Sequence, residues 1–450
     1  MFQGYSYSYS LIISIHKLSR YLSVLGRFYK SIKKSKKTNY NCFNGCILNI
    51  DTKQKILFLL YPMKSIVILF VSVVSVIVII TYCSTKKDQH SKISSQNEFF
   101  SPKFNALTKP YISNKRKHIY RFYNQVLGKD RFNGMFLVAK NGKIIFEKVN
   151  GYLDYANKKK LEINTPIHLA SISKSVTALA IMRLVDKNQI SLEDDVRKYL
   201  PILPYKGVTI RMLLTHRSGV PYYGYFADRI WDHSKKMTNQ DVLNLLNKHV
   251  FPLNFPSGTH FAYCNTNYAL LALIVEKVTG VKFPKAMKML VFNPLKMHHS
   301  FILDTPDKIN EISPSYNSRF QIQAVDFLDG IYGDKNMYSI ARDLFKMDIA
   351  TYSTDFISKK SRDEIYKGYS YENPGTRNYG LGMRMVEVPD RKPYFFHTGW
   401  WHGNTGCYAT LRRDTVCIIA LSNSYNRSVY QVHRLTEMFE GYPFEYKDEE

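Results

Sequence analysis

Three short motifs, far apart in the chain, carry side chains able to do nucleophilic and acid–base chemistry. The first is Ser171-x-x-Lys174, in the apolar helical stretch "LASISKSVTALAIMRLVDKNQ", residues 169–189. Residues three apart on a helix share one face, so the lysine amine can reach the serine Oγ. A lysine partly removed from water can accept or relay the serine proton. Alone, the motif is equally typical of an N-cap serine beside a surface lysine.

The second motif is Tyr263-x-Asn265, between the strand-like "THFAY" and a helix expected from about Asn267 to Gly280. A phenol near an ammonium ionises more readily, and a phenolate can serve as general base. Asn265 would offer an amide that orients a substrate carbonyl. The alternative is a core tyrosine, which is common in a chain with 34 tyrosines.

The third motif, His397-Thr398-Gly399, falls in the strand-like run "YFFHTGWW". We expect Gly399 to leave room for a substrate backbone along the strand edge. His397 could donate to an anionic group or to the tyrosine oxygen. In isolation, His397 is equally well explained as an ordinary strand histidine.

The elements around these motifs predict an α+β fold. "GMFLVAKNGKIIFEKVNGY" is two strands around Asn141-Gly142, a hairpin signal. The pattern implies one antiparallel sheet, built from both ends of the chain and flanked by helices, with a mainly helical insert at about 205–375. Further expected elements are helices at 114–128 and 427–440, a loop at 191–201, and antiparallel strands at 379–388, 394–401, 405–413 and 415–423, with Asp414 in the last tight turn.

Composition narrows the partners. The first 62 residues contribute +9 of the net charge of +27, which leaves +18 from Met63 onward. A basic body suits a membrane surface or an acidic polymer, whereas scattered Lys and Arg without a recognition signature argue against nucleic acid. The six cysteines contain no CxxC pair and suit no zinc site. We therefore expect no metal, no cofactor and no disulfide framework; a Cys407–Cys417 pair stays open, although the expected hairpin puts the two out of register.

The front of the chain indicates export. Residues 65–82 form an uncharged run of 18, long enough for a bilayer span or a signal core. With Cys83 after it, the segment 63–83 resembles a bacterial lipoprotein signal with Cys83 as the lipidated residue; the alternative is an uncleaved membrane anchor. We expect 1–62 to be a mis-annotated extension of the gene model, and 84–113 to be a flexible tether before a domain at 114–443.

Serine–lysine, tyrosine–asparagine and histidine–glycine, in that order, resemble the serine β-lactamase and penicillin-binding-protein superfamily. The nearest branch holds class C β-lactamases, D-alanyl-D-alanine carboxypeptidases, D-aminopeptidases and related esterases. The resemblance covers about 115–443 and includes "TIRMLLTHRSGVP", "FAYCNTNYALLALIVEKVTG", "GDKNMYSIARDLFKMD", "YGLGMRM" and "HTGWWHGNTG". It implies a β-lactamase/transpeptidase-like fold.

The resemblance also implies roles for the motif residues. Ser171 would be the nucleophile that forms an acyl-enzyme, and Lys174 would lower the barrier to its deprotonation. Tyr263 would carry the proton to the leaving group, and Asn265 would position the acyl side. His397 stands where many relatives have lysine. The remaining implied roles are an oxyanion hole made of the backbone N–H groups of Ser171 and Trp400, and substrate binding along Thr398 and Gly399.

The sequence therefore predicts a cell-envelope serine hydrolase, anchored by a lipid or a membrane segment, with its body outside the cytoplasm. Its substrate would be a small molecule or a peptide, cell-wall peptide included, cleaved at a peptide, amide or ester bond. One alternative is a true β-lactamase, which His397 disfavours because neutral imidazole holds a carboxylate less firmly than ammonium does. Another is a catalytically idle binding protein of the penicillin-binding type. Substrate identity and oligomeric state are not indicated.

Overall fold

The computed structural model describes residues 100, 102–129, 131–303, 312–373 and 375–443. The chain divides into residues 1–89 and 90–450, and every described residue belongs to the second part. The expected leader, the signal or anchor segment with Cys83, and the first part of the tether lie outside the described residues. Within the described ranges, no helix combines the length and apolarity that a bilayer crossing requires.

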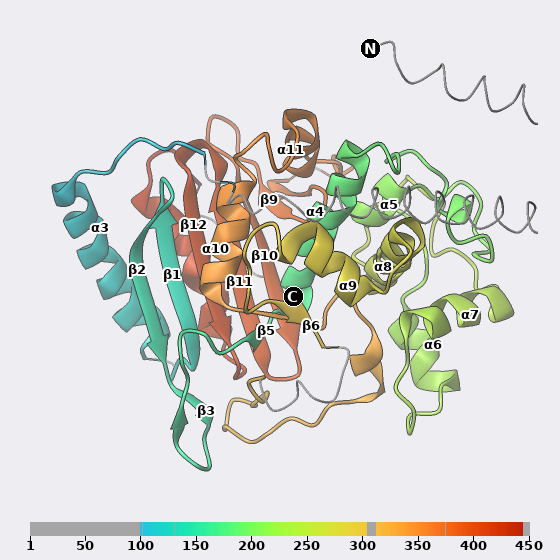
Figure 1. Cartoon of the computed structure of the whole chain (residues 1–450), viewed down its shortest axis with the longest axis horizontal. Coiled ribbons are helices and arrows are strands. Elements are labelled where there is room, and N and C mark those ends of the chain that lie inside the picture. The colour runs from blue at the N-terminus through green and yellow to red at the C-terminus, as the bar shows by residue number, and fades with distance from the viewer. Residues whose placement is uncertain (1–99, 101, 130, 304–311, 374, 444–450) are drawn as a thin grey trace, which may run out of the picture. The chain divides into compact units, whose positions relative to one another are not determined.

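A seven-stranded antiparallel sheet forms the framework, in the order β2-β1-β12-β11-β10-β9-β8 (Figure 1). Strand β1 pairs with β12, so the two ends of the domain meet in one sheet, as predicted. The strands are β1 (Gly134–Lys140), β2 (Lys143–Asn150), β8 (Arg377–Tyr379), β9 (Arg384–Val386), β10 (Tyr394–Trp401), β11 (Asn404–Leu411) and β12 (Val416–Ser422).

Local turn chemistry explains the first hairpin and corrects a later strand. Asn141 and Gly142 both have positive φ, 48° and 69°, which a two-residue hairpin turn requires. The stretch expected as one strand at 379–388 instead folds into β8 and β9. Gly382 turns between them at φ 76°, where a Cβ would lie 2.6 Å from the Ala178 side chain. The glycine therefore lets this turn pack directly on the helix that follows Ser171.

A small three-stranded sheet brings the segment before Ser171 beside a distant loop. Its order is β5-β7-β6, with β5 (Ile167–His168), β7 (Met337–Ser339) and β6 (Phe301–Ile302). The Leu169 N–H donates to the Met337 carbonyl at 2.8 Å. A two-stranded hairpin, β3 (Tyr152–Asp154) and β4 (Lys159–Lys160), completes the described strands. Residues just before Met337 are thereby placed next to Ser171.

Helices cover both faces of the main sheet. The expected helix at 114–128 begins earlier, at Lys109, and its last turn is a π-helix at Tyr123–Leu127. The α-helices are α3 (Lys109–Phe122), α4 (Ser173–Asp186), α5 (Ile210–Leu214), α6 (Tyr223–Ile230), α7 (Asn239–His249), α8 (Asn265–Thr279), α9 (Phe283–Met287), α10 (Ala341–Ala350) and α11 (Lys359–Ile365).

The C-terminal helix differs from the expected one. A 3₁₀ helix spans Arg427–Met438 where a helix over 427–440 was expected. Its buried residues Val429, Val432 and Leu435 are three apart. Three residues per turn place all three on one face, so this period suits a 3₁₀ helix.

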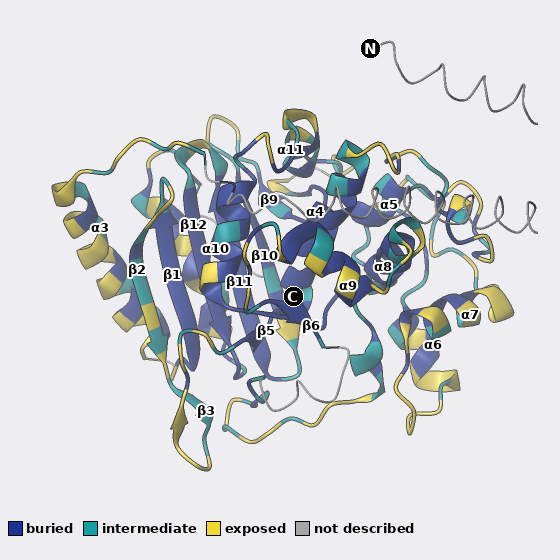
Figure 2. Cartoon of the chain, in the orientation of Figure 1, coloured by how far each residue is buried: buried dark blue, intermediate teal, exposed yellow. Residues whose placement is uncertain are grey.

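Two apolar cores lie on opposite faces of the sheet (Figure 2). One joins Leu137 and Cys417 to residues of α4, α8 and α10. The other joins Val138 and Cys407 to residues of α3 and the 3₁₀ helix. Cys407 and Cys417 belong to different cores, and neither forms a disulfide, which excludes the pairing left open above.

Candidate active site

A tight turn presents Ser171. The residue before it, Ala170, has φ 47°, which is uncommon for a residue other than glycine. The Ala170 N–H donates to His168 Nδ1 at 3.0 Å, which supports this conformation. Ser171 lies in a single 3₁₀ turn, and α4 begins two residues later at Ser173. The serine therefore sits beside the positive end of the helix dipole, as the sequence indicated.

Lys174 is completely buried, and its amine meets Ser171 directly. The Lys174 Nζ to Ser171 Oγ distance is 2.9 Å. The second partner of Nζ is the Asp334 carbonyl, also at 2.9 Å. The Tyr263 ring centre is 4.9 Å from Nζ. The sequence did not indicate Asp334, because a backbone carbonyl leaves no residue-type signal.

Tyr263 and Asn265 each carry a buried polar atom without a partner in the described part of the chain. Tyr263 Oη and Asn265 Oδ1 are buried, and neither has a hydrogen-bond partner among the described residues. Leaving such an atom unpaired costs on the order of 1–3 kcal/mol. Buried orphans are rare in native proteins and often mark a functional position. The segment "THFAY" before Tyr263 is not a strand as expected, because its N–H groups bond to loop acceptors such as the His216 carbonyl.

His397 belongs to a buried chain of directed hydrogen bonds. The Cys264 N–H donates to His216 Nδ1 at 3.1 Å, so His216 carries its proton on Nε2. That nitrogen donates to Tyr379 Oη at 3.2 Å, and Tyr379 donates to His397 Nε2 at 3.1 Å. His397 Nδ1 donates to the Thr398 carbonyl at 2.7 Å. Both ring nitrogens of His397 are therefore occupied, rather than free to donate to an anion as expected.

The same surroundings keep the two histidines neutral. Burial lowers the pKa of His397 well below its usual range, and Arg384 and Lys174 lower it further. Burial likewise lowers the pKa of His216, with Lys174 as the next cause. The imidazole of His397 thus acts as a fixed neutral group behind Tyr263, whose ring centre lies 6.2 Å from its own.

Gly399 allows β10 to touch the turn that carries Ser171. Among the described residues, β9 pairs with β10 only over Tyr394–Phe396, so the rest of β10 borders this turn. A Cβ on Gly399 would lie 2.4 Å from the Leu169 carbonyl oxygen and 3.3 Å from Ser171 N. This close approach is a different reason for the glycine from the substrate clearance expected above. It also brings together the two segments that carry the predicted oxyanion donors.

Arg384 is a site residue that the sequence analysis did not single out. Its guanidinium lies 5.0 Å from the Tyr263 ring centre, and its Nε is buried without a hydrogen-bond partner among the described residues. It lines a cavity of about 230 Å³ together with Phe261, Tyr379 and Phe396. A cation with an unused donor beside Tyr263 can receive a carboxylate.

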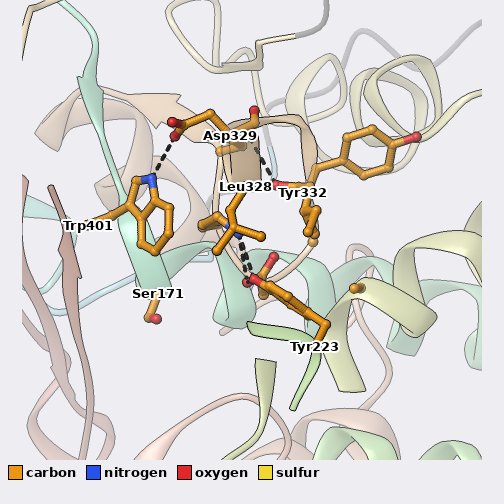
Figure 3. A network of polar contacts seen from close by, with 12 residues as sticks. Ser171, Tyr223, Leu328, Asp329, Tyr332 and Trp401 are labelled. Atoms are coloured by element: carbon orange, nitrogen blue, oxygen red, sulfur yellow. Dashed lines mark hydrogen bonds and ion pairs between the residues drawn. The ribbon is translucent and has the colours of Figure 1, made fainter. Parts of the chain in front are cut away.

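Trp400 and Trp401 differ in their surroundings. The Trp400 side chain is 62% exposed, at the rim of the site. The Trp401 indole N–H donates to Asp329 Oδ1 at 2.7 Å (Figure 3). The His402 ring bonds to the same carboxylate. Trp401 is therefore held in a fixed orientation by the loop that precedes Asp334.

A serine in contact with a buried amine, beside a phenol, is the arrangement that a serine hydrolase acting through an acyl-enzyme requires. The Beta-lactamase family model matches residues 119–441, and the chain belongs to this family. It is 33% identical to penicillin-binding protein 4* of Bacillus subtilis over 334 residues, which cover 71% of this chain and 74% of that protein. The teichoic acid D-alanine hydrolase of Staphylococcus aureus is 24% identical over 290 residues, 64% of this chain and 67% of that protein.

A solved structure shows the same fold. The penicillin-binding protein of Bacillus halodurans superposes with a TM-score of 0.62 at 24% identity, over 70% of this chain and 98% of that one. The predicted family, fold class and serine hydrolase activity are thereby confirmed. The comparisons do not favour the two alternatives, a true β-lactamase and an idle binding protein.

Proposed function

We propose that this chain is a cell-envelope hydrolase that cleaves a D-alanyl peptide bond next to a free carboxylate, through an acyl-enzyme on Ser171. The contact of 2.9 Å between the buried Lys174 amine and Ser171 Oγ carries this proposal. The similarity to a penicillin-binding protein supports the substrate class. The unpaired Nε of Arg384 beside Tyr263 supports the carboxylate, which it would hold on the leaving-group side.

The reaction follows from these positions. The Lys174 amine accepts the Ser171 proton while Oγ attacks the substrate carbonyl, and the oxyanion rests on the N–H groups of Ser171 and Trp400. Tyr263 Oη passes a proton to the leaving amine as the C–N bond breaks, and Asn265 holds the acyl side. Water then attacks the ester and gives a proton to the Tyr263 phenolate, while Lys174 returns its proton to Ser171 Oγ, which releases the acid.

The neutral His397 favours a second candidate, a D-alanyl ester. A lysine ammonium at this position would recognise a carboxylate, whereas an imidazole already bonded to Tyr379 offers no charge. The similarity to a teichoic acid D-alanine hydrolase supports the same class. In this case the bond broken is C–O, and Tyr263 protonates an alcohol instead of an amine.

We further propose that the chain acts outside the cytoplasm, held by a lipid on Cys83 or by the apolar run 65–82. The net charge of +18 from Met63 onward suits attachment beside anionic envelope polymers. The expected bounds of the leader, tether and hydrolase domain form part of this proposal. Metabolic labelling with a radioactive fatty acid tests it, since Cys83→Ser should abolish incorporation only if Cys83 is lipidated.

Matched substrates separate the two candidate reactions. A D-alanyl-D-alanine peptide and its C-terminal amide should differ in kcat/KM by about 10- to 100-fold in favour of the free acid. Arg384→Met should remove this preference and leave a D-alanyl ester of a neutral alcohol unaffected. Ester turnover with no peptide turnover by the wild type would instead establish the second candidate.

A further inference from the structure

A closed triangle of buried polar groups lies behind Lys174. Tyr223 Oη donates to Asp334 Oδ2 at 2.6 Å, and Lys335 Nζ donates to Tyr223 Oη, also at 2.6 Å. Lys335 Nζ is 3.4 Å from Asp334 Oδ2, which closes the triangle. The three residues are 0%, 0% and 3% exposed, so water does not share these bonds. We call this set, Tyr223, Asp334 and Lys335, the Asp334 triangle.

This arrangement is costly, and its geometry is therefore restricted. Removing a carboxylate and an ammonium from water costs several kcal/mol for each ion, which only good mutual geometry offsets. Asp334 Oδ1 is buried with no hydrogen-bond partner among the described residues, so Oδ2 carries the polar contacts of that carboxylate. Lys335 also lies over the Trp401 ring, 4.6 Å from its centre. Burial lowers the pKa of Lys335 while Asp334 raises it.

The triangle connects directly to the catalytic amine. The backbone carbonyl of Asp334 is the acceptor that Lys174 Nζ uses besides Ser171 Oγ. The next residues continue the same loop: Asn336 Oδ1 bonds to His168 Nε2 at 3.2 Å, just before Ser171. Figure 3 shows Tyr223 and Trp401 on the two sides of this loop, with Ser171 nearby. A shift of the loop would move the acceptor of Lys174.

We propose that Tyr223 and Lys335 are positioning residues, which fix the Asp334 carbonyl so that Lys174 points at Ser171 Oγ. This inference rests on the proposed roles of Ser171 and Lys174. The triangle touches the reacting atoms only through Lys174. It should therefore govern the rate of acylation and leave the affinity for the acyl donor unchanged.

The fold supplies a matched control with the same chemistry elsewhere. Tyr408 Oη donates to Asp348 Oδ1 at 2.8 Å, and Arg412 lies 3.9 Å from the same carboxylate oxygen. Tyr408 and Asp348 are as buried as Tyr223 and Asp334, at 1% and 2% exposed. This second set joins α10 to the sheet. Tyr408→Phe thus removes an equivalent buried hydroxyl without touching the proposed machinery.

The experiment compares Tyr223→Phe, Tyr408→Phe, Lys335→Met and Lys335→Arg in the full chain. A fluorophosphonate probe phosphonylates the nucleophilic serine with loss of fluoride, so it gives the maximal rate of this modification, kinact, and the apparent affinity, KI, while thermal unfolding reports stability. Tyr223→Phe and Lys335→Met should lower kinact by about 10- to 100-fold with KI within about twofold. Lys335→Arg should restore kinact to within about fivefold of wild type, because it keeps the charge. Tyr408→Phe should lower Tm comparably and keep kinact.

Equal kinact for Tyr223→Phe and Tyr408→Phe would overturn the inference, as would a loss confined to KI. Tyr223→Phe also decides the question if Lys335→Met fails to fold. Ser171→Ala in the same assay distinguishes a failure of the proposed function from a failure of the positioning role alone. Labelling that persists in Ser171→Ala overturns the proposed function. Its loss there, with full kinact in Tyr223→Phe, overturns only the positioning role.

Discussion

Two buried networks of this protein contain the same three kinds of group and do different work. The Asp334 triangle and the Tyr408–Asp348–Arg412 set each join a tyrosine, an aspartate and a cation away from water. Arg412 lies over the Tyr352 ring, 3.4 Å from its centre, and binds the Thr351 side chain at 2.8 Å. Its contacts hold the end of α10 to the sheet. The Asp334 triangle instead ends on the amine of Lys174.

The kinds of side chain in a buried network do not by themselves identify it as catalytic, because the two networks contain the same kinds. Burial raises the pKa of Asp348 and lowers the pKa of Lys335, so each set contains a perturbed group. What differs is the neighbour that the network positions. A perturbed group is thus a reason to trace its contacts, and the atom at the end of those contacts decides the role.

The largest expected effect is a loss of kcat when Lys174, on which the Asp334 triangle ends, is replaced. Lys174→Met should reduce kcat by at least about 10³-fold, because no other amine reaches the Ser171 Oγ in the described residues. Steady-state hydrolysis of the best substrate from the panel above measures it. Activity within tenfold of wild type would mean that another group takes the serine proton.

The next largest effect is a loss of stability when the Tyr408–Asp348–Arg412 set is broken. Arg412→Met should destabilise the fold by about 3–5 kcal/mol, because it leaves the buried Asp348 without its cation. Urea unfolding measures this change. The kcat per folded molecule should stay within about twofold of wild type. A large fall in kcat at full stability would erase the distinction between the two networks.

A smaller effect is expected where β10 meets the Ser171 turn. Gly399→Ala places a methyl group 2.4 Å from the Leu169 carbonyl, so the turn must move away from the strand. Displacement of the oxyanion donors should lower kcat by about 100-fold with little change in KM. The control is Gly207→Ala, where a Cβ meets nothing within 4 Å and only the backbone, at φ 81°, is strained. Equal activity of the two variants would exclude this role for the contact.

The smallest effect concerns pH. Burial lowers the pKa of His168 from 6.5 to about 4, so the unfolded chain binds a proton there that the folded one excludes. The stability linked to His168 is complete above about pH 6.5 and falls as the pH drops toward 4. Unfolding at pH 7.5 and 5.0 should differ by about 2 kcal/mol less in His168→Gln than in wild type. An identical difference in both would contradict this assignment.

The sequence predicts those parts of the fold that local chemistry determines. Asn141-Gly142 specifies its hairpin because both residues tolerate positive φ, and the strands of "YFFHTGWW" and "TVCIIALSN" follow from apolar runs. The split of 379–388 could not be predicted, because Gly382 turns there to fit against Ala178, a tertiary contact. The spacing of three among Val429, Val432 and Leu435 is a sequence signal for the 3₁₀ helix at Arg427–Met438.

The candidate site likewise combines residues that local sequence indicates with residues that only tertiary contacts bring together. A spacing of three puts Ser171 and Lys174 on one helix face, and the order of the three motifs then favours a catalytic pair over an N-cap serine beside a surface lysine. The Asp334 carbonyl could not be predicted, because any residue supplies a carbonyl and its position depends on the fold. His216 and Tyr379 lie in blocks quoted for the resemblance, but no spacing links them to His397, and the three meet only in three dimensions. Arg384 stands inside the quoted block "YGLGMRM", and a single charged residue in this uncharged block was the one signal available.

The most direct test of the proposed role of Ser171 as nucleophile is to locate the covalent adduct. The full chain is labelled with a fluorophosphonate, digested, and analysed by mass spectrometry, with Ser171→Ala treated in parallel. If Ser171 is the nucleophile, a single adduct is expected on the peptide that contains Ser171, and none in Ser171→Ala. An adduct on another serine, or equal labelling of Ser171→Ala, would contradict this role.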